Sequence, residues 1–188
     1  MPENSVSVDN ASIGGKFTGR DDNSISFNQT GDRSMYLHDL YEKFNQEKEN
    51  NQDLKDFCEE LDYLNSIIDV EVIGLEQKLI DGDREYMLLY AKEVKERFHK
   101  KLMRTSQYSS IAQDINVFLL TKVRRGFMTE IYGLICKKGS EEKINLLITE
   151  RIINPVKADL GVNLFRYNED DIMGMIFFLT GNCHIKWN

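Results

Sequence analysis

The stretch MLLYAKEVKERFHKKL, residues 87–102, carries the clearest helical pattern in this chain of 188 residues. Its apolar side chains recur every three or four positions, at Met87, Tyr90, Ala91, Val94, Phe98 and Leu102. Because an α-helix turns once in 3.6 residues, this spacing aligns them on one face, as in a helix that packs against a core. The stretch therefore predicts a long amphipathic helix and a mainly α protein.

The same spacing recurs on both sides of this stretch and predicts a bundle of six or seven helices. The other helices are expected at about residues 37–44, 54–64, 67–80, 109–138, 144–152 and 168–181. The fifth of these is expected to stop at Asn154, because a residue before proline disfavours the helical conformation. Asn168, followed by three acidic residues, is a typical N-cap. The apolar alternation in CHIKW, residues 183–187, predicts a short terminal strand.

The first 33 residues have a different character, because Gly, Ser, Asn and Asp dominate and apolar residues alternate with polar ones. This pattern predicts a Gly-rich β arm over residues 1–33, with a helical interaction domain over residues 34–188. Three roles stay open for the arm: a mobile tail, a strand added to the chain's own body, or a strand layer shared between subunits. Pairing with a partner or another copy is favoured, since open strand edges pair. The candidate interface residues are Val6, Val8, Ile13, Phe17, Gly19, Arg20, Asp21, Ile25 and Phe27.

Composition restricts the class of protein. The hydrophobic share of 41% is enough for a core, and the net charge of −7 argues mildly against a protein that coats nucleic acid or an anionic membrane. The three cysteines form no CxxC pair, so neither a zinc site nor a disulfide framework is indicated. The N-terminus lacks the basic start and apolar run of a signal peptide, and no apolar run is long enough to cross a bilayer. We expect a cytoplasmic protein without membrane contact.

No pattern for catalysis, metal or cofactor binding is found. Cys183 and His184 are adjacent, and neighbours in an extended segment point to opposite faces, so they do not form a nucleophile–base pair. The acidic run after Asn168 is explained by helix capping rather than by a metal. The stretch GGKFTG lacks the ending of a phosphate-binding loop. We therefore expect no enzyme, no metal site and no cofactor.

One helix is locally basic. Residues 92–104 carry six Lys or Arg and two Glu, a charge of about +4. Arg97, Lys100, Lys101 and Arg104 are the candidates for contact with nucleic acid, through neutralisation of phosphates. The simpler alternative is a solvated helix surface. The alternative function that this pattern supports is a small nucleic-acid-binding protein using helix 92–104.

Three stretches resemble a known family. VIGLEQKLIDGDREYMLLYAKEVKERFHKKL, INLLITERIINPV and DDIMGMIFFLTGNCHIKW are similar to the C-terminal domain of ABC-three-component systems, which are related to Lamassu-type anti-phage defences. The similarity covers about residues 35–188. The N-terminal NSVSVDNASIGGKFTGRDDNSISFN resembles the Gly-Arg-Asp β segment of bacterial conflict-system proteins.

The resemblance implies a role in assembly. In such systems an SMC-like ABC ATPase senses foreign or aberrant DNA, and partner subunits couple it to an effector. The C-terminal domain usually joins the complex, with an effector attached before it. Here only about 33 residues precede the helical part, so the enzyme is expected in another chain, or the chain works without one. The resemblance thus implies a non-enzymatic subunit that links the ATPase to the effector, associates with itself through the arm, and contacts DNA mainly through the complex.

Overall fold

The computed structural model describes residues 31–47, 58–67, 73–161 and 163–188. All nine candidate interface residues of the N-terminal arm lie outside these ranges, so the β arm stays a prediction. Within the described ranges the protein is mainly α and contains no strand. The first helix begins at Gly31, inside the segment expected to be part of the arm.

The described helices follow one another closely along the chain. They are α1 (Gly31–Glu47), α2 (Glu59–Asn65), α3 (Leu75–Asp81), α4 (Leu88–Ser106), α5 (Ser110–Gly126), α6 (Tyr132–Cys136), α7 (Glu141–Ile148), α8 (Asn154–Leu160) and α9 (Glu169–Gly181). A 3₁₀ turn, η1 (Glu85–Met87), precedes α4, and the π-helical turns η2 (Phe127–Ile131) and η3 (Thr149–Ile153) join α5 to α6 and α7 to α8. When continuous helices are counted once, the described part has seven, as the sequence predicted.

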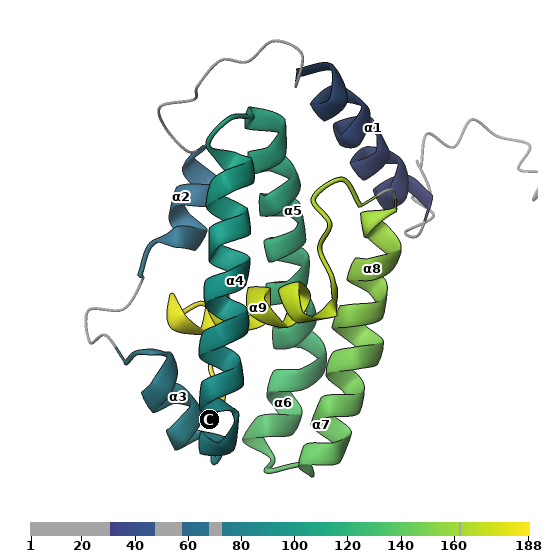
Figure 1. Ribbon diagram of the computed structural model, residues 1–188. Coiled ribbons are helices and arrows are strands. Elements are labelled where there is room, and N and C mark those ends of the chain that lie inside the picture. The colour runs from purple at the N-terminus through teal and green to yellow at the C-terminus, as the bar shows by residue number, and fades with distance from the viewer. Residues whose placement is uncertain (1–30, 48–57, 68–72, 162) are drawn as a thin grey trace, which may run out of the picture.

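The helix α9 forms the centre of the bundle. Figure 1 shows α4, the α5–α6 helix and the α7–α8 helix standing side by side, with α9 crossing them. Ten of the thirteen residues of α9 are buried, which is typical of a core helix rather than an amphipathic surface helix. The helices α1 and α2 pack on the outside of α5, and α3 packs on α9.

The start of α9 confirms the predicted cap and adds a second role for it. The Asn168 side chain accepts a hydrogen bond from the Asp171 backbone N–H (2.9 Å), and the Asp171 carboxylate accepts one from the Asn168 backbone N–H (2.8 Å). This reciprocal capping box satisfies two backbone donors that the helix itself leaves free. Since Asp171 is fully buried, its charge also needs a cation inside the protein.

The helix that was expected to stop at Asn154 continues through Pro155, so this prediction was wrong. The π-helical turn η3 comes directly before α8, and Pro155 lies in the first turn of α8. Proline is tolerated where its N–H is not needed, and a π-helical turn alters the local hydrogen-bond register. Val156 and Leu160 beyond the proline are buried. Their packing favours a continued helix.

The predicted terminal strand is also absent from the described residues. Cys183 has a left-handed backbone (φ 67°), and the His184 N–H donates to the carbonyl of Leu179 (2.8 Å), which closes α9 with a helix-terminating turn. The residues that follow lie in irregular structure, with Ile185 and Trp187 buried. Alternating burial thus arises here from a tail packed against helices, because no neighbouring strand is present among the described residues to pair with it.

His184 is held by the end of α2. Its Nε2 lies 3.1 Å from the carbonyl oxygen of Leu64, which also accepts from the Asn182 side chain (3.1 Å). A carbonyl oxygen can only accept, so the neutral ring carries its proton on Nε2. Nδ1 is buried and has no hydrogen-bond partner among the described residues. Burial first, and then the charge of Arg124, hold the His184 pKa below its usual value of 6.5.

This lowered pKa predicts acid sensitivity. In the unfolded chain the histidine titrates near its ordinary value, so the unfolded state binds the proton first as the pH falls. We expect the free energy of unfolding to decrease between about pH 7.5 and pH 5.5. In His184→Gln, which cannot titrate, the decrease should be shallower. Urea unfolding at a series of pH values measures both slopes, and equal slopes would contradict the prediction.

Candidate interaction surfaces

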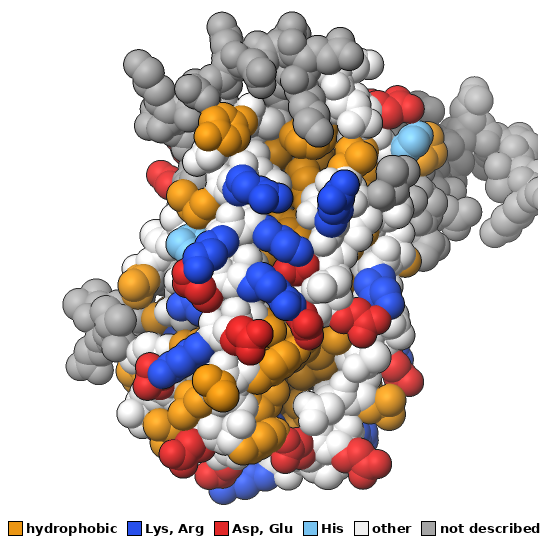
Figure 2. Space-filling view, viewed as in Figure 1, with side chains coloured by type: hydrophobic (Ala, Val, Ile, Leu, Met, Phe, Trp, Pro, Cys, Tyr) orange, Lys and Arg blue, Asp and Glu red, His pale blue; other side chains and the backbone are white. Residues whose placement is uncertain are grey.

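The exposed side of α4 carries two different surfaces. Figure 2 shows Lys and Arg side chains gathered over the C-terminal half of α4, with acidic side chains directly beside them and hydrophobic side chains exposed below. The hydrophobic surface belongs to the start of α4 and to α3 before it. The two surfaces are described in turn.

The first surface, here called the apolar patch, consists of Ile80, Tyr86 and Leu89. Their exposed fractions are 41%, 63% and 81%. Ile80 and Leu89 line one groove of about 870 Å³ between α3 and α4. Charged residues of both signs, including Glu76 and Lys92, surround it, and these two form an ion pair at 2.6 Å. An apolar centre with a charged rim is the usual composition of a protein-binding surface.

The second surface contains the four cationic residues predicted from the sequence, and three of them have acidic partners within the chain. Arg97 lies 2.9 Å from the Asp170 carboxylate and 3.5 Å from that of Asp171. Lys101 lies 2.5 Å from the Asp171 carboxylate. Lys100 pairs with Glu96 one turn earlier (3.2 Å). Because these three cations are paired with carboxylates of the same chain, they are less available to bind an external phosphate.

The ion pair between Arg97 and Asp170 affects both groups. The hydrogen bond from Arg97 holds the Asp170 pKa below its usual value, and the same bond raises the Arg97 pKa. Tyr90 also donates to Asp170 (3.1 Å). Burial and that hydrogen bond raise the Tyr90 pKa to about 12. Asp170 and Asp171 therefore fix the start of α9 onto α4, a role that capping alone did not reveal.

The remaining candidate, Arg104, is exposed, and so is Arg166, a cation that the sequence did not indicate. The Arg166 carbonyl accepts a hydrogen bond from Lys101 (3.1 Å), and Lys101 precedes Arg104 by about one helical turn. Among the described residues neither arginine has an acidic partner, and both are exposed. Arg166 lies in the loop before α9, so no local pattern in the sequence linked it to helix 92–104.

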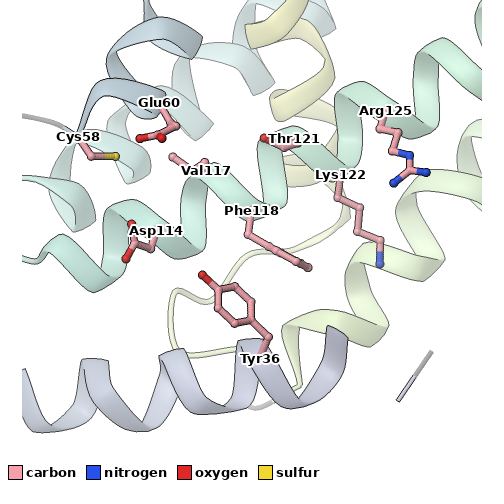
Figure 3. Close-up of a pocket in the computed structure, with 9 residues that line it drawn as sticks. All are labelled: Tyr36, Cys58, Glu60, Asp114, Val117, Phe118, Thr121, Lys122 and Arg125. Carbon is pink, nitrogen blue, oxygen red and sulfur yellow. The ribbon is translucent and has the colours of Figure 1, made fainter. Parts of the chain in front are cut away.

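A second groove, of about 480 Å³, lies where α1 and α2 meet α5. Figure 3 shows Tyr36 of α1 facing Phe118 of α5, with Cys58, at the start of α2, toward the opposite end of the groove from Lys122 and Arg125. The Tyr36 and Phe118 rings are 5.8 Å apart. Lys122 closes one end and is already bonded to Asp159 of α8. The groove was not predicted, because its walls come from three separate segments.

Within the described ranges, no group of three or more His, Cys, Asp or Glu side chains is arranged to hold a metal ion. No helix that the structure describes combines the length and apolarity needed to cross a bilayer.

Comparison with known proteins gives one match. Residues 74–187 match the model of C-terminal domain 9 of the ABC-three-component (ABC-3C) systems. The matched part begins one residue before α3 and includes every helix from α3 to α9 together with the buried tail. The searches of curated proteins and of solved structures found no match.

The match is shorter than the similarity expected from the sequence. It leaves out α1 and α2, and it does not include the Gly-Arg-Asp segment. The relation of this chain to Lamassu-type systems in particular stays a prediction. Because the family model matches more than half of the chain, the chain belongs to the family of C-terminal domain 9 of the ABC-three-component systems.

Proposed function

We propose that this protein is a non-enzymatic interaction subunit of a bacterial anti-phage defence complex, acting in the cytoplasm. In this role its helical body links an SMC-like ABC ATPase to an effector subunit. The N-terminal arm, from Val6 to Phe27, pairs between copies and makes the protein a homo-oligomer. Light scattering on the full chain measures this self-association, and a monomer at every concentration would remove that part of the proposal.

The observation that carries the proposal is the apolar patch within the family domain. The Leu89 side chain is 81% exposed, and burying its apolar surface in an interface would be favourable. A single exposed apolar residue needs no explanation, but Leu89 and Ile80 share a groove, and Tyr86 lies three residues before Leu89. Tyrosine is also frequent among residues that dominate binding energy. These features support docking of another component onto α3 and α4.

Replacing Leu89 with aspartate tests this docking. A buried carboxylate at the centre of an interface is unfavourable, so binding to the ATPase or effector subunit should weaken at least about tenfold. Leu146→Asp is the matched control, because Leu146 on α7 is also exposed (55%) but lies outside the patch. Isothermal titration calorimetry with each subunit measures the affinities. Equal affinities for the two variants would contradict docking through the patch.

Direct DNA binding is the second candidate function, and Arg104 with Arg166 supports it. We infer that the isolated chain makes few phosphate contacts, since three of the four cations predicted for the task have acidic partners. Two contacts correspond to a slope of about −1.8 for log K against log salt, and four to about −3.6. DNA is then contacted mainly through the complex.

Fluorescence anisotropy of a labelled duplex at increasing NaCl concentration measures this slope. Arg104→Glu combined with Arg166→Glu should abolish binding, whereas Lys143→Glu, at an exposed position of α7, should leave it unchanged. A slope of about −4 in the unmodified chain would contradict the count of two.

A further inference from the structure

The groove between α1, α2 and α5 is built partly from the family domain and partly from helices outside it. Val117, Phe118 and Arg125 belong to the matched residues, whereas Tyr36 and Cys58 do not. Because three of its nine lining residues, Tyr36, Cys58 and Glu60, lie outside the family domain, the groove suits an occupant that is particular to this chain. Its lining is mixed, but Tyr36 faces Phe118 in it (Figure 3) and Val117 also lines it. An occupant that contacts this part should supply apolar side chains.

The segment that precedes α1 meets both conditions. It ends at Thr30, directly before Gly31, and its last apolar residues are Ile25 and Phe27. Four residue steps separate Phe27 from Gly31, an extended reach of at most about 14 Å. Tyr36 lies about 7.5 Å further along α1 at the usual rise of a helix. The reach is therefore long enough for Phe27 to contact the Tyr36 side of the groove when the chain reverses direction before Gly31.

We propose that Ile25 and Phe27 of the same chain dock into this groove and anchor the base of the N-terminal arm. The two side chains alternate with Ser24 and Ser26, so an extended segment points both of them to the groove floor and both serines to solvent. Burial of a phenylalanine side chain is favourable, and the segment is already tethered to α1, so no large interface is needed to hold it. Ile25 and Phe27 are then anchors within the chain, and the proposed pairing between copies is limited to the arm residues from Val6 to Asp21.

Cys58 reports on this docking because it lines the groove and is half-buried. In the full chain with Cys136→Ser and Cys183→Ser, Cys58 is the only thiol left. A docked segment shields it, so Ile25→Ser with Phe27→Ser should raise its rate of modification by a thiol reagent about tenfold. Val6→Ser with Val8→Ser, a change of the same kind further along the arm, should leave the rate unchanged.

Three results would overturn the proposal. Equal rates in the two double variants would mean that residues 25 and 27 do not cover the groove. Protection of Cys58 that increases with protein concentration would identify a second copy as the occupant. Protection that appears only when another subunit is added would identify a partner protein. Circular dichroism on each variant checks that the helices remain folded, so that a faster reaction reports an uncovered groove.

Discussion

Replacing Asp171 with alanine is expected to lower the free energy of unfolding by about 3–5 kcal/mol. Asp171 is fully buried at the start of α9 and combines two roles there. Its carboxylate accepts the Asn168 N–H as part of the capping box, and it faces the cationic groups of Lys101 and Arg97. Removing the carboxylate leaves Lys101 without its acidic partner and Arg97 with Asp170 alone. It also removes one of the two hydrogen bonds of the capping box.

Asp170→Ala is the matched control for this variant. Asp170 is the preceding residue and also pairs with Arg97, but its side chain is 46% exposed. Solvent screens an exposed pair, so its loss should cost at most about 1 kcal/mol. Chemical denaturation of both variants at neutral pH gives the comparison. If the two variants lost the same stability, the buried carboxylate would not be the main link between α4 and α9.

The second large effect is expected at Gly174, where α9 crosses α4. A Cβ atom at this position would lie 2.4 Å from the Val94 carbonyl oxygen and 2.7 Å from Phe98 Cβ. Both atoms belong to the body of α4, so they cannot move aside as a flexible side chain would. Gly174→Ala should therefore separate the two helices and lower the free energy of unfolding by about 2–3 kcal/mol, the upper part of the range for overpacking.

Gly133→Ala is expected to have the opposite sign. Gly133 lies in α6, where an added Cβ meets no heavy atom within 4 Å. Alanine favours the helix and restricts the unfolded chain, so stability should increase by about 0.5–1 kcal/mol. Thermal unfolding of the two variants side by side distinguishes tight helix packing from a general effect of glycine replacement. A loss of stability in both would contradict this reading of Gly174.

The helices were predictable because their information is local. Apolar spacing gave α4, and the polar residues after Tyr167 gave the cap of α9. The helix end predicted at Asn154 was wrong because proline usually terminates a helix. Here a π-helical turn precedes Pro155 and buried residues follow it, and both favour a helix that continues. The strand predicted for residues 183–187 was wrong because alternating apolar residues do not distinguish a strand from an irregular segment packed on helices.

The surfaces were harder to predict because their parts are distant in sequence. Helix 92–104 was recognised as basic, but the acids that pair with Arg97 and Lys101 come from α9, about 70 positions later. The same holds for the contact of the Arg166 carbonyl with Lys101 and for Tyr36 against Phe118. Periodicity in one segment carries no information about which charges a second segment will bring to it.

The position of α9 late in the chain has a consequence for biosynthesis. The helices made earlier can form their backbone hydrogen bonds, but the space between them stays unfilled until residues 169–181 have been synthesised. A nascent or truncated chain therefore exposes the apolar surfaces that α9 covers in the folded protein. Such intermediates tend to aggregate or to be degraded. In the proposed complex we therefore expect a copy to join only after α9 has been synthesised and has covered these inner faces.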